Sequence, residues 1–409
     1  MVTQNVFADG TYDYTVKATD MAGNSTVVTE SVQIKTTLQP TTLQLNNQSD
    51  LMTNQPLPTL SGQSEPHATI QVSLSGEIYS TVADAQGAWS IMVTSPLASG
   101  SHSLKVQVTD IAGNSEKISE TVWVDTTLPA ATAKLTESSD SGAKGDNLTQ
   151  HQAVTLEGIT KPQSAVVIQF AGQEYSTLAD KDGQWQVALP AVSQDGEYDY
   201  QVSVTDTVGN IGTSTGQFIV DTQVDSLSVH LDTLSDSGKV GDHITQESRP
   251  HFSGKAEAGS RVELTIGGQH VVTTADSHGD WSVVTQNVLA DGTYDYAVKA
   301  TDVAGNSTVV TESVQIKTTL QSTTLQLNNQ SDLMTNQPLP TLSGQSEPHA
   351  TIQVSLSGEI YSTVADAQGA WSIMVTSPLA SGSHSLKVQV TDIAGNSEKI
   401  SETVWVDTT

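Results

Sequence analysis

Apolar and polar residues alternate along many short stretches of the chain. The stretches 261–266, 69–74, 198–204 and 294–298 each place an apolar residue at every second position. A period of two predicts strands with one buried face. Roughly seven such strands in each unit, separated by Gly, Asn and Asp turns, predict an all-β fold of tandem immunoglobulin-like β-sandwich domains in an elongated rod. No segment predicts an amphipathic helix.

The chain also repeats itself. Residues 2–127 recur as residues 284–409 at an offset of 282, and only five of the 127 aligned pairs differ when Met1 is placed opposite Val283. Repetition on this scale is typical of arrays whose length is part of their function, and it is unusual for catalytic domains.

Shorter motifs divide the array into domains. The turn motif TDxxGN begins at residues 19, 109, 205, 301 and 391, and ADxxGxW begins at 83, 179, 275 and 365. These motifs predict domains at 38–127, 128–222, 223–319 and 320–409, an ordinary domain size. Residues 1–37 match only the C-terminal strands of a domain, so we expect Met1 to mark an internal boundary. We expect the tryptophans of ADxxGxW to pack between the sheets; they are Trp89, Trp185, Trp281 and Trp371.

Composition narrows the function classes. The chain has no cysteine, which excludes disulfides and cysteine-based metal sites. Lys and Arg total 16 against 45 Asp and Glu, a formal charge of -29, which argues against a nucleic-acid partner and favours cation binding. No apolar run is long enough to insert this segment into a membrane, and no signal peptide opens the sequence.

Acidic turns are the candidate metal ligands. The loop SDSGxxGD occurs at 139–146 and 235–242, each TDxxGN turn adds an aspartate, and the VDT linkers add more. Carboxylates at a domain boundary suit Ca²⁺, which takes six to eight oxygen ligands. The predicted ligands are Asp50, Asp110, Asp125, Asp140, Asp146, Asp206, Asp221, Asp236, Asp242, Asp302 and Asp392.

The predicted sites differ between junctions. We expect Asp140, Asp146, Asp221 and Asp302 to converge between the third and fourth units counted from the partial one. The following linker carries Lys317 in place of an aspartate, and the first linker carries Lys35, so calcium is doubtful at both. A plain turn is the competing interpretation, because Asp and Asn before Gly favour tight turns without any metal.

Other chemistry finds no support in the sequence. The ten histidines show no metal-ligand spacing, and neither HExxH nor GxSxG occurs. The acidic residues recur in every unit, and an active site repeated in each copy is not expected. We therefore predict that this segment is not an enzyme.

These motifs resemble one known family. The DTT linkers, SDSGxxGD, ADxxGxW and YDYxVxxTDxxGN, with the absence of cysteine, resemble the bacterial Ig-like repeats of giant type I-secreted non-fimbrial adhesins of the SiiE type. The resemblance implies a monomeric rod of Ig-like domains with calcium near the joints, secreted and retained at the bacterial surface. It further implies attachment to a host-cell surface, a glycan receptor or other bacterial cells, with roles in virulence and biofilm.

Two alternatives to a stalk stay open. The first is a carbohydrate-binding module array, for which Trp123 and Trp405 are the aromatic residues least clearly buried by the pattern. The second is an accessory region of a secreted polysaccharide-degrading enzyme.

Overall fold

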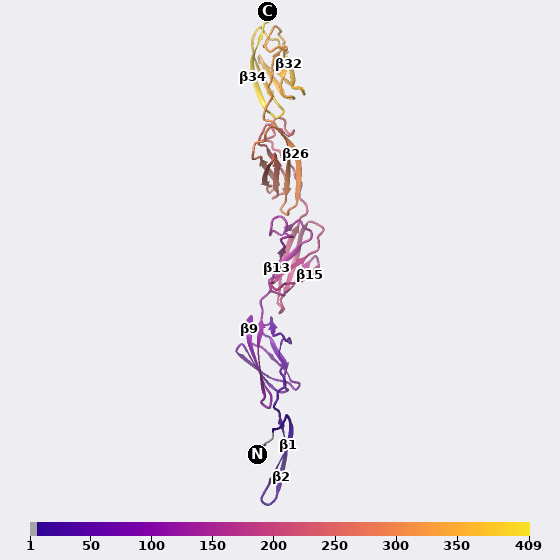
Figure 1. Cartoon of the computed structure of the whole chain (residues 1–409), viewed down its shortest axis with the longest axis vertical. Helices are drawn as coiled ribbons and strands as arrows, with labels where there is room; N and C mark the ends of the chain where they lie inside the picture. Colours follow the sequence, from indigo (N-terminus) through magenta and orange to yellow (C-terminus); the bar gives the residue numbers. More distant parts are fainter. Residues whose placement is uncertain (1–5) are drawn as a thin grey trace. The chain divides into compact units, whose positions relative to one another are not determined.

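The secondary structure of the described residues consists of strands alone. This computed structural model describes residues 6–409, and its 34 strands run in the order that Figure 1 colours from indigo to yellow. Within those residues no helix could cross a membrane. The backbone divides into two compact units, one of 1–136, 154–190 and 199–217, the other of 137–153, 191–198 and 218–409.

The domain 38–127 is a two-layer β-sandwich. Its strands are β3 (Gln44–Leu45), β4 (Met52–Thr53), β5 (Thr59–Gln63), β6 (Thr69–Leu74), β7 (Glu77–Val82), β8 (Ala88–Met92), β9 (Gly100–Thr109) and β10 (Ser115–Val124). One sheet has the order β4-β10-β9-β6-β7 and the other β3-β5-β8. Adjacent strands pair antiparallel, except that β4 pairs parallel to the end of β10.

The domains 223–319 and 320–409 have the same topology. The first holds β19 (His230–Leu231), β20 (Ile244–Thr245), β21 (His251–Lys255), β22 (Arg261–Ile266), β23 (Gln269–Thr274), β24 (Asp280–Val284), β25 (Gly292–Thr301) and β26 (Ser307–Ile316). The second holds β27 (Gln326–Leu327), β28 (Met334–Thr335), β29 (Thr341–Gln345), β30 (Thr351–Leu356), β31 (Glu359–Val364), β32 (Ala370–Met374), β33 (Gly382–Thr391) and β34 (Ser397–Val406).

Residues 128–222 contribute strands to both units. They are β11 (Lys134–Leu135), β12 (Leu148–Thr149), β13 (Thr155–Ile159), β14 (Ala165–Phe170), β15 (Gln173–Leu178), β16 (Gln184–Ala188), β17 (Gly196–Thr205) and β18 (Ile211–Val220). In the first unit β13 pairs with β11 and β16, and β14 pairs with β15 and β17. In the second, β12 pairs with the end of β18. The predicted all-β sandwich fold is confirmed.

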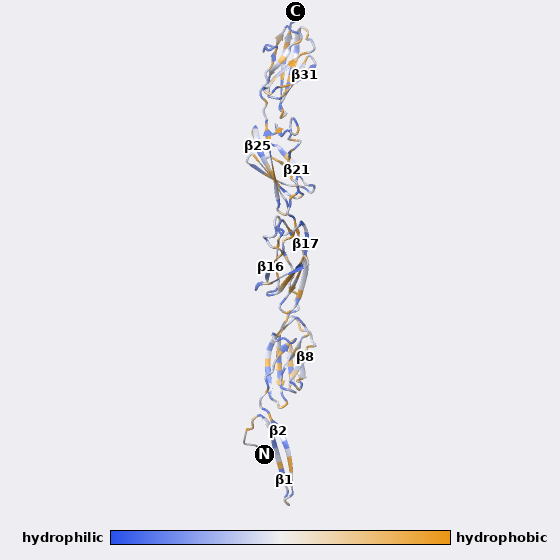
Figure 2. Ribbon diagram, turned by 90° about the vertical axis from the view of Figure 1, so that its right-hand side faces the viewer, coloured by the Kyte–Doolittle hydropathy of each residue, from blue (hydrophilic) through white to orange (hydrophobic). Residues whose placement is uncertain are grey.

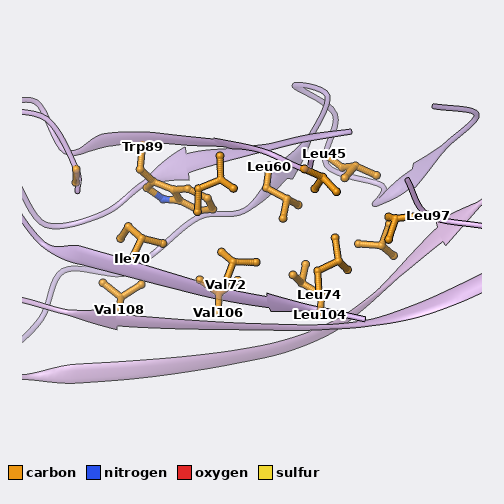
Figure 3. Close-up of a cluster of buried hydrophobic side chains, with 14 of the residues drawn as sticks. Leu45, Leu60, Ile70, Val72, Leu74, Trp89, Leu97, Leu104, Val106 and Val108 are labelled. Carbon is orange, nitrogen blue, oxygen red and sulfur yellow. The ribbon is translucent and has the colours of Figure 1, made fainter. Parts of the chain in front are cut away.

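The core of each sandwich comes from the predicted alternation. In domain 38–127, Ile70, Val72 and Leu74 of β6 are at most 1% exposed. Figure 3 shows them facing Trp89, Leu60 and Leu45 of the three-stranded sheet. Figure 2 shows the same mixture of apolar and polar positions along the strands of the other domains. Burying such apolar area contributes roughly 25 cal/mol per Å² and is the main force holding each domain together.

The four tryptophans of ADxxGxW are buried, as predicted, and each lies over a glycine. Their exposure is 3–4%, and their strand partners are Gly62, Gly158, Gly254 and Gly344. A Cβ at Gly254 would lie 2.0 Å from the carbonyl oxygen of Ser228 and 2.9 Å from the Trp281 ring. Only glycine therefore allows the indole and the segment that leads into β19 to approach this closely.

The partial domain is a bare hairpin. Strands β1 (Gly10–Thr19) and β2 (Ser25–Ile34) pair with each other along their full length. Tyr14 and Val16 are 44% and 54% exposed, whereas their counterparts Tyr296 and Val298 are buried at 2% and 0%. Strands β1 and β2 have the same turn and pairing as β25 and β26, although Thr15 and Met21 stand where the later hairpin has Ala297 and Val303.

Replacing Gly254 with alanine tests the glycine–tryptophan contact. We expect Gly254→Ala to destabilise the domain 223–319 by about 1–3 kcal/mol, because the new methyl group overpacks the core. Differential scanning calorimetry should show one transition lowered by roughly 5 °C or more. The control is Ser282→Ala on the exposed face of β24. Equal melting of the two variants would contradict this account.

Candidate metal centre

Each TDxxGN turn holds the linker that enters its domain. In the turn at 301–306, Asp302 Oδ1 accepts the backbone N–H of Asn306 at 2.8 Å and Oδ2 accepts its side-chain amide at 2.9 Å. That amide also donates to the carbonyl oxygen of Asp221 in the linker, at 2.8 Å. Asn114, Asn210 and Asn396 make the same contact with the carbonyls of Lys35, Asp125 and Lys317.

The turn at residues 19–24 has the same internal hydrogen bonds. Asp20 accepts the backbone N–H and the side-chain amide of Asn24. These hydrogen bonds are therefore part of the turn motif itself. In the four complete domains the same aspartate is only 4–7% exposed, so its charge requires a partner.

Three side chains meet at each joint between a linker and the domain that follows. We call them the linker position, the loop position between the strands equivalent to β5 and β6, and the turn position. At the first joint these positions hold Lys35, Glu65 and Asp110, and at the second Asp125, Lys161 and Asp206. At the third they hold Asp221, Glu257 and Asp302, and at the fourth Lys317, Glu347 and Asp392.

Three joints carry their own cation. At the second joint the Lys161 ammonium lies 2.8 Å from Asp125, 2.8 Å from Asp206 and 2.5 Å from the carbonyl oxygen of Thr127. At the fourth, the Lys317 ammonium lies 3.2 Å from both Glu347 and Asp392 and 2.7 Å from the Thr319 carbonyl oxygen. At the first, Lys35 pairs with Glu65 at 2.9 Å.

The third joint has three carboxylates and no ammonium. The ligand oxygens of Asp221, Glu257 and Asp302 lie within 4.8 Å of one another. Gln223, at the position equivalent to Thr127, directs its carbonyl oxygen to the Asn306 amide at 3.3 Å. Since the equivalent oxygens surround the ammonium groups of the second and fourth joints, this joint has the donor set for a cation from solvent. Oxygen donors with this charge fit Ca²⁺.

The pKa values separate the two kinds of joint. The hydrogen bond from Lys161 is the main cause that lowers the pKa of Asp125 to about 2. At the third joint, burial and then the neighbouring carboxylates raise the pKa of both Asp221 and Glu257 above their ordinary values. Like charges held together in this way are stabilised by a metal ion or by a proton.

The SDSGxxGD loops connect to the next domain through their backbone and serine. Ser141 donates to the carbonyl oxygen of Ala304 at 2.5 Å, and Ser237 donates to that of Ala394 at the same distance. Both acceptors lie in TDxxGN turns. A Cβ at Gly142 would approach the Val303 carbonyl oxygen to 1.9 Å, so only glycine allows this contact. These loops therefore connect each domain to the TDxxGN turn of the next one at the third and fourth joints.

The loop aspartates accept hydrogen bonds within their own loops, and one oxygen each of Asp140 and Asp236 is buried without a hydrogen-bond partner in the part of the chain that the structure describes. Asp140 and Asp236 each accept the backbone N–H five residues on, from Gly145 and Gly241, at 2.6 Å. Asp146 and Asp242 accept from the N–H two residues on, at 2.9 and 3.0 Å. None of these four belongs to the carboxylate group at the third joint. Asp50 is exposed in the shorter loop of its domain.

The sequence analysis missed the loop position. Lys161 and Glu257 fall in KPQS and EAGS, which share no motif with each other or with the EPHA of the other two domains. The available signal was an alignment of the four domains, in which the charge changes sign at the loop position as well as at the linker position. Of the expected group, the structure brings Asp221 and Asp302 together and adds Glu257.

A comparison with known families is consistent with this arrangement of repeats. The profile of the bacterial Ig-like domain matches residues 40–126, 127–222, 223–319 and 319–408. The chain belongs to the bacterial Ig-like domain family. No curated protein matches this array.

Several solved structures are similar to the array. One is titled a Ca²⁺-stabilized adhesin that helps an Antarctic bacterium reach out and bind ice, at 24% identity over 91% of this chain and 100% of that one, with a TM-score of 0.29. A tetra-tandem repeat from the extending region of a large adhesion protein is 22% identical over 90% of this chain and 99% of that one, with a TM-score of 0.33. The structure of a 1.5-MDa bacterial ice-binding adhesin is 24% identical over 69% of this chain and 100% of that one, with a TM-score of 0.29. At these TM-scores the likeness supports no functional argument.

The two kinds of joint should respond oppositely to pH. Because the folded pKa of Asp125 is depressed to about 2, its stabilising effect is present above the ordinary carboxyl pKa and is lost as pH falls towards 2. Because the folded pKa values of Asp221 and Glu257 are raised, stability at that joint falls as pH rises through the carboxyl range in the absence of a cation.

Carboxyl ¹³C NMR titration in chelator measures these pKa values directly. We expect the pKa of Asp125 to lie well below that of Asp221. Lys161→Gln should raise the pKa of Asp125 and leave the pKa of Asp221 unchanged. Indistinguishable titrations of the two aspartates in the unsubstituted protein would refute the assignment of charges at the joints.

Proposed function

We propose that this array is an extending segment of a secreted bacterial surface adhesin of the SiiE type, and that calcium stiffens its third joint. The observation that carries the proposal is the recurrent joint, in which two carboxylates are neutralised by lysine three times and a third carboxylate replaces lysine once. A chain that rebuilds the same charge-balanced joint at every boundary has the organisation expected of a mechanical spacer.

The proposed cation centre uses the groups already in place. Asp221, Glu257 and Asp302 supply carboxylate oxygens, and the Gln223 carbonyl oxygen corresponds to the one that contacts lysine at the second and fourth joints. The Asn306 amide fixes Asp302 and the linker together. Affinity in the range of extracellular modules, about 10⁻⁴–10⁻³ M, would fill the site outside the cell and leave it empty during export.

The remaining parts of the proposal concern the whole adhesin. The segment holds a distal binding region away from the bacterial surface, and the partner is a host cell, a glycan or another bacterium. Secretion by the type I route and the absence of catalytic activity belong to the same proposal. The support for it is the family, the tandem organisation and the charge balance at the joints.

Exchanging charges at the loop position tests the calcium centre. We expect Glu257→Lys to abolish calcium binding, because it supplies the ammonium that Lys161 supplies one domain earlier. We expect Lys161→Glu to create a second site from Asp125 and Asp206. Isothermal titration calorimetry should give about one calcium site for the parent, none for Glu257→Lys and about two for Lys161→Glu.

A matched control is Glu247→Lys, which makes the same charge change at an exposed position of the same domain. It should retain the parental site. Small-angle X-ray scattering then tests the mechanical effect, and we expect chelator to reduce the maximum dimension of the parent and not of Glu257→Lys. Calcium binding unaffected by Glu257→Lys would refute the centre.

A further inference from the structure

One sheet face in this acidic protein carries no carboxylate. Strand register places alternate residues of β6, β7, β9 and β10 on the outer side of the five-stranded sheet in domain 38–127. These outward residues are serine, threonine, glutamine, valine, Ile78, Lys105, Lys117 and Trp123, and β4 adds Met52. We call this surface the lysine face.

The lysines of this face are free to meet a ligand. Lys105 and Lys117 form no ion pair with any residue that the structure describes. With Gln71, Gln107 and Ile78 they line a shallow depression of about 200 Å³. The same depression recurs in domain 320–409 around Lys387 and Lys399, and it again has about 200 Å³.

An exposed tryptophan extends each face. Trp123 is 54% exposed and pairs with Met52 at the sheet edge, and Trp405 pairs with Met334 in the copy. Trp123 lies six residues from Lys117 along β10, a distance of roughly 20 Å. A ligand that touches both the lysines and the indole is therefore extended.

The equivalent faces of the other two domains differ. In residues 128–222 the lysine positions are Gln201 and Thr213, and Glu174 lies on the outer face, where it accepts a hydrogen bond from Gln169. In domain 223–319 they are Ala297 and Val309, and Glu263 lies on that face. The combination of two lysines, tryptophan and no carboxylate belongs to 38–127 and 320–409.

We propose that the lysine face binds an extended acidic polysaccharide. Two ammonium groups on a neutral surface complement a polymer with spaced carboxylate or sulfate groups, and the amides and hydroxyls match sugar hydroxyls. The indole offers an apolar surface for a sugar ring. The protein's charge of -29 opposes every polyanion, and it opposes duplex nucleic acid, with one charge per about 1.7 Å, more strongly than a polysaccharide with a single carboxylate on each sugar.

Binding of the full array to immobilised heparin, alginate and neutral dextran tests this. The measurements are made in chelator, so that they are independent of the calcium centre, and at about 0.15 M salt, where the Debye length is roughly 8 Å. We expect binding to at least one acidic polysaccharide and none to dextran. The variant K105Q/K117Q/K387Q/K399Q should bind about tenfold more weakly, and W123A/W405A should also bind more weakly.

The control K134Q/K181Q/K255Q/K299Q changes the net charge by the same amount at positions outside the lysine faces, and it should bind like the parent. Four results would overturn the proposal: no binding to either acidic polysaccharide, equal weakening by the control, stronger binding to duplex DNA or anionic vesicles, or self-association of the array through these lysines in sedimentation.

Discussion

The organisation of the array depends on one buried charge. The turn-position aspartate of each complete domain is almost fully buried. It accepts a hydrogen bond from the asparagine whose amide also donates to a backbone carbonyl of the incoming linker. A buried carboxylate is costly unless a cation or several hydrogen bonds compensate it. A lysine lies close to this aspartate at three joints, whereas the third joint places further carboxylates there, so the residues beside the aspartate distinguish one joint from another.

The fold was readable from the sequence because strands, turns and the Trp–Gly contact are determined within a domain. Alternation located the buried faces, and the acidic turns located the joints. The pairing of Asp221 with Asp302 followed from the positions of the linker and the last hairpin. Asp140 and Asp146 do not belong to this carboxylate group, because the loop contacts the next domain through its serine and backbone, while its aspartates accept hydrogen bonds within the loop.

The loop position could not be read in the same way. Its residue lies about forty positions from the linker or the turn that it contacts, and nothing in its neighbourhood marks it as functional. Its role exists only in three dimensions, where Lys161 and Glu257 occupy equivalent places with opposite charge. Single-sequence reasoning recognises ligands by motif, so a site completed by an isolated side chain escapes it.

Because a joint combines one residue from the preceding linker with two from the following domain, neighbouring domains are matched to one another. Removing 128–222 would place Asp125 beside Glu257 and Asp302, creating a centre of three carboxylates at a boundary that now holds lysine. Removing 223–319 would instead join Asp221 to Glu347 and Asp392, again without an ammonium group. A shift of 282 residues preserves every pairing, since Lys35 and Lys317 precede domains that differ only at Pro40 and Ser322. The array can therefore change length in steps of three domains without changing how any of its joints is neutralised.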